Sequence, residues 1–425
     1  MSKCALGRLP WVIGLLLLAL IVSGAALGAT AAPPTDCTWQ SQTLISDIGE
    51  YGGFTSLDID SHGYPHLVFY NHNTTSLSYQ YFDGSNWVSE TVDTDGTGAF
   101  ASLELDNADR PHVSYYDGLA EALKYATKDG TGWHKETVDD QGNAGFYTSL
   151  ALDTKQRPHI AYLDAEGGNI RYAWKDVTGW HTETLEFVGA PGEAIRTMSL
   201  VMEANGQAHL SYYREYSQDL RYARRDASTW HPETVDRQDD KGKLSSLALD
   251  ANGYPHIAYR DSTNNELRYA RWDGTQWLKS TVDSDGDVGW YPSLAFDSQG
   301  NAHVAYRDIR NGLLKYALWG GSSWMVGTVD GEGDAGLFVS LALDTGDSPH
   351  IAHVAYDEEE VRYAHCARQQ PTPTATATTQ PSATATATQT TGPTATPTGT
   401  QTATPTTTPT PPTGENVLYL PVILR

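Results

Sequence analysis

The sequence predicts an all-β protein: a seven-bladed β-propeller of four-stranded blades, its ring closed by an N-terminal strand. Three observations predict this fold. A unit recurs seven times along the chain, a lone strand precedes the first unit, and two cysteines bracket all seven copies. We expect the folded part to span residues 37–368.

Each repeat is anchored by a serine, and successive anchors lie 46 to 50 residues apart. A histidine follows each serine by 10 residues, and a tyrosine follows each histidine by 13. In six copies a tryptophan follows that tyrosine by 8 residues. Only the step from tryptophan to the next serine varies, between 15 and 19 residues. The seven serines are Ser56, Ser102, Ser149, Ser199, Ser246, Ser293 and Ser340.

Each copy contains four short segments rich in Leu, Val, Ile, Tyr and Trp, separated by Gly, Asn and Asp, as expected of four strands. An Asp-Gly pair stands between the third and fourth segments of several copies, as at Asp83-Gly84 and Asp273-Gly274. Asp-Gly is a favoured two-residue hairpin turn, so we expect these pairs to join the two strands.

The chain ends favour a closed ring over a linear array. The seventh copy lacks a tryptophan strand after Tyr363, and an unpartnered one, Trp39 to Ile45, precedes the first copy. We therefore expect the first strand to complete the last blade. Cys37 and Cys366 would then face each other across adjacent antiparallel strands, within reach of a disulfide. In the loop-closure picture such a bridge contributes roughly 4 to 5 kcal/mol.

Both ends outside the repeats have biased compositions. Lys3 and Arg8 precede an apolar run that ends in small residues, which predicts a secretory signal peptide over residues 1–31. Residues 369–414 are Thr, Pro, Ala, Gln, Gly and Ser without a charge, which predicts a disordered linker. Residues 415–425 form a short apolar tail, interpreted either as a sorting signal for cell-envelope attachment or as a strand that docks on another surface. We therefore expect a secreted protein, associated with the cell surface if the tail attaches it.

The formal charge of the chain is −24, and removal of Lys3 and Arg8 with the signal peptide makes it −26. So acidic a protein repels phosphate backbones, so nucleic acid is not an expected partner. No stretch after the signal peptide is long and apolar enough to span a bilayer.

In a propeller, the connection from the fourth strand to the next blade opens on the same face as the loop between strands two and three. Only that connection varies in length here, so we expect a binding site on that face. Polar pairs end the predicted second strands, and aromatic residues occupy the connections, so sugar pockets between blades are the favoured interpretation. The alternative is that the aromatic residues pack blade against blade. The strongest candidates are Arg260, Asp261, Trp290, Tyr291, Arg307 and Asp308.

Three further patterns in the sequence bear on possible sites. Asp283, Asp285 and Asp287 alternate along one connection, as oxygen ligands of Ca²⁺ do, although solvated turn carboxylates are the favoured explanation. The seven recurring histidines occupy one position in every copy, which predicts a repeated structural hydrogen bond rather than a metal or catalytic site. The connection from Glu186 to Arg196 is the longest and departs from the repeat, so it marks either an asymmetric site or sequence drift.

The repeat, with its Asp-Gly-x-x-Trp element, resembles the fucose-lectin-like and Asp-box (sialidase-like) propeller superfamilies over residues 37–366. The resemblance implies glycan recognition at blade junctions on one face. A scaffold or adhesin that binds surface proteins is the alternative, followed by a sialidase-like glycoside hydrolase or lyase. The near-perfect repetition counts against an enzyme, because an acid–base pair requires one blade to differ from its neighbours.

Overall fold

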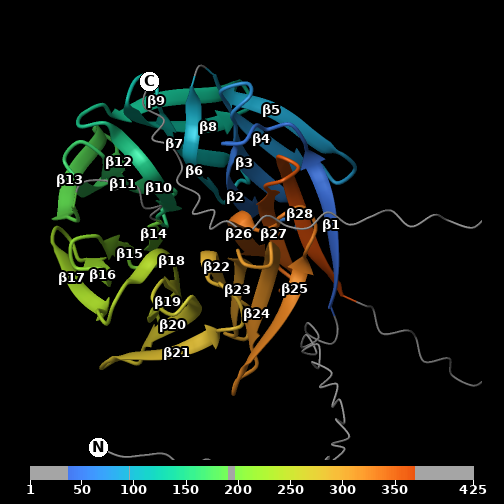
Figure 1. The fold of residues 1–425 in the computed structure, drawn as a ribbon. Helices are drawn as coiled ribbons and strands as arrows, with labels where there is room; N and C mark the ends of the chain where they lie inside the picture. The colour runs from blue at the N-terminus through green and yellow to red at the C-terminus, as the bar shows by residue number, and fades with distance from the viewer. Residues whose placement is uncertain (1–36, 95, 190–196, 369–425) are drawn as a thin grey trace, which may run out of the picture.

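The computed structural model describes residues 37–94, 96–189 and 197–368. Within these ranges the strands form seven four-stranded antiparallel sheets arranged as blades around a central channel (Figure 1). The predicted seven-bladed propeller is therefore confirmed. No helix in the described part of the chain is long and apolar enough to cross a membrane. The predicted signal peptide, linker and tail lie outside the described residues.

The blades are numbered along the chain, and each begins at the channel and ends at the outer edge. Blade 1 consists of β2 (Gly53–Ile59), β3 (Pro65–Asn71), β4 (Ser76–Phe82) and β5 (Trp87–Asp93). Blade 2 consists of β6 (Thr97–Leu105), β7 (Pro111–Asp117), β8 (Ala122–Asp129) and β9 (Gly132–Asp139). Blade 3 consists of β10 (Ala144–Leu152), β11 (Pro158–Asp164), β12 (Asn169–Asp176) and β13 (Gly179–Phe187). Blade 4 consists of β14 (Ser199–Met202), β15 (Ala208–Arg214), β16 (Asp219–Arg225) and β17 (Trp230–Asp236). Blade 5 consists of β18 (Lys241–Leu249), β19 (Pro255–Asp261), β20 (Glu266–Trp272) and β21 (Trp277–Asp283). Blade 6 consists of β22 (Trp290–Phe296), β23 (Ala302–Asp308), β24 (Leu313–Trp319) and β25 (Trp324–Asp330). Blade 7 consists of β26 (Leu337–Leu343), β27 (Pro349–Ala355), β28 (Glu360–Arg368) and β1 (Cys37–Ile45).

The first strand completes the last blade, as expected: β1 pairs antiparallel with β28 (Figure 1). The register places Trp39 opposite Cys366 and Cys37 opposite Arg368. The two cysteines are therefore offset by two residues in the register rather than directly opposite each other. The side chain of Cys37 lies outside the described residues, so the disulfide stays a prediction.

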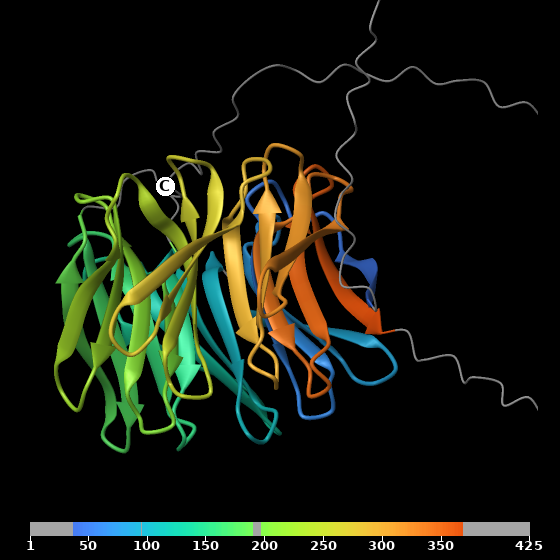
Figure 2. The same ribbon diagram turned by 90° about the horizontal axis from the view of Figure 1, so that it is seen from below.

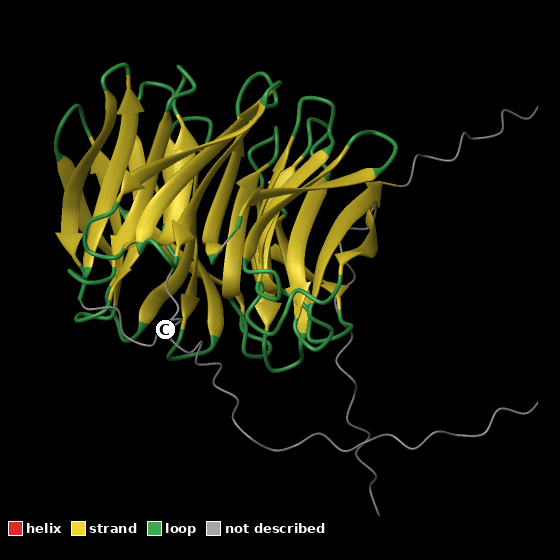
Figure 3. Cartoon of the chain, turned by 90° about the horizontal axis from the view of Figure 1, so that it is seen from above, coloured by secondary structure: helices red, strands yellow, loops and turns green. Residues whose placement is uncertain are grey.

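The strands run between two faces of a short cylinder, with loops at both ends (Figures 2 and 3). We call the end with the connections between blades and the loops between strands two and three the loop face. We call the other end, with the turns between strands one and two and between three and four, the turn face. On the loop face each connection bonds to the neighbouring loop, as in the bond from the Gly96 N–H to the Thr75 carbonyl, 2.8 Å. The two kinds of loop therefore lie on the same face, as expected.

The hairpin turns between strands three and four are shifted by one residue from the prediction. In blade 1 the Asp83 N–H donates to the Asn86 carbonyl, so the two turn residues are Gly84 and Ser85 rather than Asp83 and Gly84. The Asp83 carboxylate accepts the Ser85 and Asn86 N–H groups at 2.8 and 2.7 Å. Aspartate stabilises the turn as a side-chain acceptor, and Gly84 supplies the positive φ of 92°.

The recurring serines join the blades around the channel. Each serine Oγ accepts the N–H of a leucine in the next blade at 2.9 to 3.0 Å, and the series closes where Ser340 accepts the Leu57 N–H. A buried N–H that lost this acceptor would cost about 1–3 kcal/mol, which explains the repeated serine.

The recurring histidine, tyrosine and tryptophan form a second joint. Within each blade the histidine Nδ1 and the tyrosine hydroxyl share a hydrogen bond, so the structural interpretation of the seven histidines is confirmed. The tryptophan of the next blade packs edge-on against that tyrosine at all seven junctions, with ring centroids 5.1 to 5.3 Å apart. Trp39 makes this contact with Tyr316, so β1 supplies the tryptophan that the seventh copy lacks.

Candidate functional site

The candidate residues predicted at blades 5 and 6 are brought together, but mostly by contacts within the protein. The Arg260 guanidinium lies over the Trp290 ring, 4.3 Å from its centroid, and 2.8 Å from Asp287 Oδ1. The same oxygen accepts the Trp290 indole N–H at 2.9 Å. Arg260 is only 4% exposed, and it also donates to the Val288 carbonyl.

The other members of that set are also buried and paired. Arg307 pairs with Asp334 at 2.6 Å. Asp308 accepts the Asn311 side-chain amide at 2.6 Å, and Asp261 pairs with Lys241. The Tyr291 ring packs against Phe338. Their charged groups already have partners, so in this geometry they act as supports for the loop face.

The three aspartates predicted to bind calcium point to different partners. The Asp283 carboxylate accepts the Tyr306 hydroxyl at 2.6 Å and pairs with Lys315 at 2.5 Å. Asp287 is held by Arg260, and Asp285 is exposed. The structure does not gather the three carboxylates around one point, since no grouping of potential metal ligands in the described residues contains them. Calcium binding there stays a prediction.

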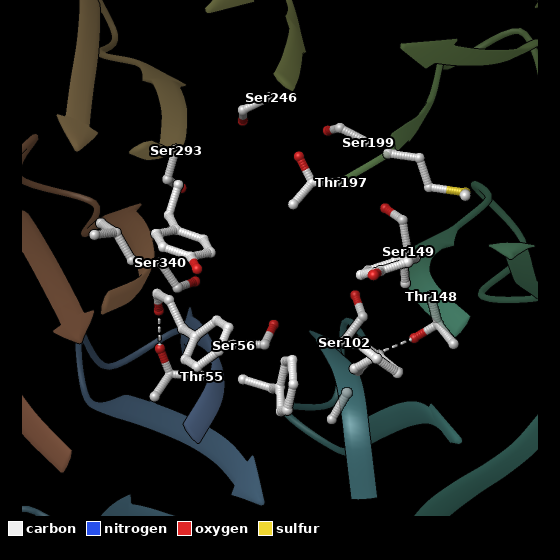
Figure 4. Close-up of a pocket in the computed structure, with 18 of the residues that line it drawn as sticks. Thr55, Ser56, Ser102, Thr148, Ser149, Thr197, Ser199, Ser246, Ser293 and Ser340 are labelled. Carbon is white, nitrogen blue, oxygen red and sulfur yellow. Dashed lines mark hydrogen bonds between the residues drawn. The ribbon is translucent and has the colours of Figure 1, made fainter. Parts of the chain in front are cut away.

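The central channel holds a cavity of about 240 Å³ lined by the first strands of all seven blades (Figure 4). Two residues before the serine, five blades carry an aromatic ring. These rings form a continuous arc with centroids 4.4 to 5.0 Å apart: Tyr291, Phe338, Phe54, Phe100 and Tyr147. All five have positive φ, between 50° and 57°, which is rare for bulky residues. Hydroxyl groups of the serines and of Thr55, Thr148 and Thr197 complete the lining (Figure 4).

No Asp, Glu, His, Lys or Arg is among the described residues that line this cavity. It therefore offers stacking surfaces and hydroxyl groups rather than charged side chains. The prediction had treated the aromatic residues of the connections as one set, whereas the structure divides them. Phe146 and Trp290, one position earlier, pack between blades against Tyr116 and Arg260.

Two carboxyl groups stand on the neighbouring innermost strands β2 and β6. Asp58 Oδ2 accepts the Leu105 N–H at 2.8 Å, which places it beside Glu104. Burial raises the pKa of Asp58 to about 6, and burial together with the Asp58 charge raises the pKa of Glu104 well above its usual value. A carboxyl pair of this kind is a functional candidate, because it holds a proton near neutral pH.

Three further pockets lie on the turn face, at the junctions of blades 3 and 4, 4 and 5, and 5 and 6. Their volumes are about 460, 470 and 520 Å³. Each is lined by the histidine and tyrosine of one blade and by turn residues of the next. These pockets are at blade junctions, as expected, but they open on the face opposite to the predicted one.

At three of the seven junctions a cation from the later blade bridges to the preceding blade. A lysine or arginine three residues after the repeat tyrosine pairs with a glutamate on the fourth strand of the preceding blade: Lys128 with Glu90 and Lys175 with Glu136, at 2.5 and 2.6 Å. Between blades 3 and 4, Arg225 Nε donates to Glu183 at 2.7 Å. We call this contact the inter-blade ion pair.

Blades 5, 6, 7 and 1 depart from that pattern, and blades 5 and 6 border the pockets described above. The cation is replaced by Trp272 and by Trp319, and each pocket instead contains an arginine from the preceding blade, Arg224 or Arg271. Both arginines are exposed, and neither belongs to an ion pair among the described residues. Tyr254 adds a second ring to the pocket between blades 4 and 5.

Between blades 5 and 6, Phe296 plays the role of that second ring. These two pockets thus combine arginine and aromatic residues, but not the residues predicted. The signal was present in the sequence as departures from the repeat, two and three residues after the repeat tyrosine.

No protein-family model matches the chain, and no curated protein matches it. Solved structures share the fold at low sequence identity. An ulvan lyase of polysaccharide lyase family PL25, bound to a GlcA–Rha3S saccharide, is 12% identical with a TM-score of 0.53, over 72% of this chain and 90% of the lyase. A copper-bound fungal alcohol oxidase of family AA5 is 10% identical with a TM-score of 0.51, over 78% of this chain and 76% of the oxidase.

A third structure is the GH93 α-L-arabinofuranosidase of Fusarium graminearum in complex with arabinobiose. It is 10% identical with a TM-score of 0.45, over 63% of this chain and 92% of that enzyme. The likenesses to the lyase and the oxidase concern the fold alone. They assign the chain to neither the fucose-lectin-like nor the Asp-box superfamily.

Proposed function

We propose that this protein is a carbohydrate-binding propeller whose sites are the pockets between blades 4 and 5 and between blades 5 and 6. One observation carries the proposal: these two adjacent junctions lack the inter-blade ion pair and present an exposed arginine facing an aromatic wall instead. That the PL25 lyase shares the fold and was seen with a saccharide makes a carbohydrate ligand plausible.

The chemistry of these pockets suits a sugar ring. A planar aromatic face packs against the C–H face of a sugar and excludes water, and an arginine fork donates two parallel hydrogen bonds to vicinal hydroxyls or to a carboxylate. In the pocket between blades 4 and 5, Trp272 and Tyr254 supply the rings and Arg224 the fork, while Glu203 adds an acceptor. The volume of about 470 Å³ lies within the range of roughly 300–1,000 Å³ usual for small-molecule sites.

Two similar sites on one face favour weak but multivalent binding, because the second contact forms at a high effective concentration. An exported protein that carries such sites would meet glycans in the surrounding medium or on cell surfaces. We propose an extracellular location on the basis of the signal-peptide pattern in residues 1–31, with the segment 369–414 as a spacer.

The test is a screen of the chain, without its predicted leader, against a panel of glycans and polysaccharides, with and without a calcium chelator. Binding with a dissociation constant in the millimolar to micromolar range, about −4 to −8 kcal/mol, is expected for single sites. Arg224→Ala and Arg271→Ala should each weaken it, while Lys175→Ala at the ion-paired junction of blades 2 and 3 should not. A blank panel on folded protein would overturn the proposal and favour a protein-binding scaffold.

An enzyme is the second candidate, and the carboxyl pair Asp58 and Glu104 is the observation that favours it. A protonated and an ionised carboxyl side by side are what glycoside hydrolysis requires. Release of reducing ends from a polysaccharide, lost in Glu104→Gln and retained in Arg224→Ala, would establish that activity. No turnover on any polymer that binds would leave the carbohydrate-binding function alone.

A further inference from the structure

Outside the pockets already described, three potential metal ligands meet on the turn face between blades 1 and 2. Asp60 and His62 stand in the turn between β2 and β3, and Asp109 in the corresponding turn of blade 2. One donor atom from each lies within 4.8 Å of the other two, and no second grouping of this kind occurs among the described residues. His62 is 69% exposed at its side chain, so its ring nitrogen is accessible.

We propose that Asp60, His62 and Asp109 form a binding site for a divalent transition-metal ion of the zinc type, bridging blades 1 and 2. His62 Nδ1 lies 3.7 Å from Asp60 Oδ2 and 3.9 Å from Asp109 Oδ2. Bonds from zinc to nitrogen and oxygen ligands are about 2.0–2.2 Å, so two ligands on one ion can be separated by up to roughly 4.2 Å. All three donors thus reach one ion with only a small movement of exposed side chains.

The carboxylates are already held in position. Asp60 Oδ1 accepts the backbone N–H groups of His62 and Tyr64 at 2.9 and 2.7 Å, which leaves Oδ2 directed at the imidazole. Asp109 accepts both the N–H and the hydroxyl of Ser61, at 2.9 and 2.7 Å. Hydrogen bonds of this kind orient metal ligands and raise affinity.

A second imidazole points at the same place. His66 is 7% exposed, and its Nε2 atom lies 3.6 Å from Asp60 Oδ2, beyond a normal hydrogen bond. Its Nδ1 atom is bonded to the Tyr79 hydroxyl. Its Nε2 atom is therefore placed to act as a fourth ligand. A set of imidazole and carboxylate donors selects zinc, copper or nickel over calcium and magnesium.

The same chain contains a matched junction without the histidine. Between blades 6 and 7, Asp347 accepts the Ser298 N–H and hydroxyl at 2.8 and 2.6 Å, and Asp297 accepts the backbone N–H of residue 299. Gln299 stands where blade 1 has His62 and donates to Asp347 at 3.1 Å. Asn301 stands where blade 1 has Tyr64, and its amide donates to Asp297 Oδ2. A glutamine at the position of His62 is therefore compatible with the same backbone.

The experiment uses the tag-free chain, treated with a chelator and dialysed, with ZnCl₂ titrated by calorimetry and bound metal counted by mass spectrometry. One zinc ion per chain is expected. His62→Gln, which copies blade 6, should weaken zinc binding at least tenfold and remove the rise in Tm that zinc causes, without changing the Tm of the metal-free protein. Excess calcium or magnesium should not displace the zinc.

The reverse variant tests the same idea by gain. Gln299→His combined with Asn301→Tyr copies the blade 1 residues into blade 6 and should raise the count to two ions per chain. Zinc binding that is absent in the wild type, or unchanged in His62→Gln, would overturn the proposal. So would displacement of zinc by equal calcium, which indicates adventitious binding by an acidic surface. His62 lies outside the pockets of blades 4 to 6, so the glycan binding of His62→Gln should not change.

Discussion

The junction of blades 3 and 4 and that of blades 4 and 5 contain the same residue types in opposite order. At the first, Trp174 of the earlier blade meets Arg225 of the later one, whose guanidinium lies 5.0 Å from the Trp174 ring centroid. At the second, Arg224 of the earlier blade meets Trp272 of the later one. Arg225 is bonded to Glu183 at 2.7 Å, whereas Arg224 is exposed.

The difference teaches that the position in the repeat, rather than the residue type, decides whether an arginine is available for a ligand. The position three residues after the repeat tyrosine faces the fourth strand of the preceding blade, which carries a glutamate at both of these junctions, Glu183 or Glu233. The position two residues after the tyrosine of the preceding blade faces the pocket. A cation at the first position is held by that glutamate, as Arg225 is at what we call the closed junction, and a cation at the second is exposed in the pocket, as Arg224 is at the open junction.

The largest expected effect is the loss of stability when the closed junction is broken. Glu183→Ala removes the partner of both Arg225 and the Trp230 indole N–H, which donate at 2.7 and 2.8 Å. We expect destabilisation of about 2–3 kcal/mol, because two donors lose a charged acceptor. Chemical denaturation measures it. Glu233→Ala is the control at the open junction, where only the Trp277 indole donates, and it should cost about 1 kcal/mol less. Equal losses would contradict the comparison.

The next effect is closure of the open junction. Trp272→Lys places a cation opposite Glu233 and reproduces the ion pair of the first two junctions. We expect glycan affinity at this pocket to fall at least about tenfold, or about 1.4 kcal/mol, while the Tm is not lowered. Calorimetric titration with a ligand from the glycan screen measures the affinity. Undiminished binding by the folded variant would exclude the pocket as the site.

A smaller effect concerns the tryptophan joint at the open junctions. The indole nitrogen of Trp324 is buried without a hydrogen-bond acceptor, because Ser280 occupies the position of the glutamate. Ser280→Glu supplies that acceptor, so we expect a gain of about 0.5–1.5 kcal/mol. Gly327→Glu should do the same for the orphaned Trp39 indole at the next junction. Thermal unfolding measures both, and a lower Tm in both variants would refute the explanation.

The smallest expected effect is a difference in pH dependence between two equivalent histidines. Burial, aided by the charges of Arg157 and Arg225, lowers the pKa of His159 at the closed junction to about 4. The unfolded chain titrates near pH 6.5 and so binds the proton first. Stability is therefore intact above about pH 6.5 and is lost as the pH falls from there toward 4.

Substitution of the two histidines compares them directly. His159→Gln should reduce that acid-induced loss, and His209→Gln at the open junction should reduce it less, because Glu203 lies 3.2 Å from the His209 ring and partly offsets the burial. The difference should be below about 1 kcal/mol in denaturation midpoints between pH 4 and 7. An equal or larger effect at His209 would contradict the comparison.

Much of the fold could be predicted because a repeat multiplies weak signals. Strict spacing of Ser, His, Tyr and Trp reflects joints that every blade must make, and the displaced tryptophan strand indicated how the ring closes. The candidate site was harder to predict. Arg260 and Arg307 resembled ligand-binding residues, yet tertiary packing buries both against Asp287 and Asp334. Arg224 and Trp272 depart from the repeat but were not predicted as site residues, since only the junction brings them together in one pocket.

The sequence by itself determined the number of blades, the order of strands and the closure by β1, because these follow from spacings and from local strand and turn chemistry. Only the tertiary structure decided which arginines stay exposed, which aromatic rings meet in the channel and which carboxylates lie within reach of an imidazole. Those outcomes depend on pairs of residues that are far apart in the chain, such as Glu183 and Arg225, which are 42 positions apart. Burial and pairing of charges are properties of both partners together, and the linear pattern around either one does not contain them.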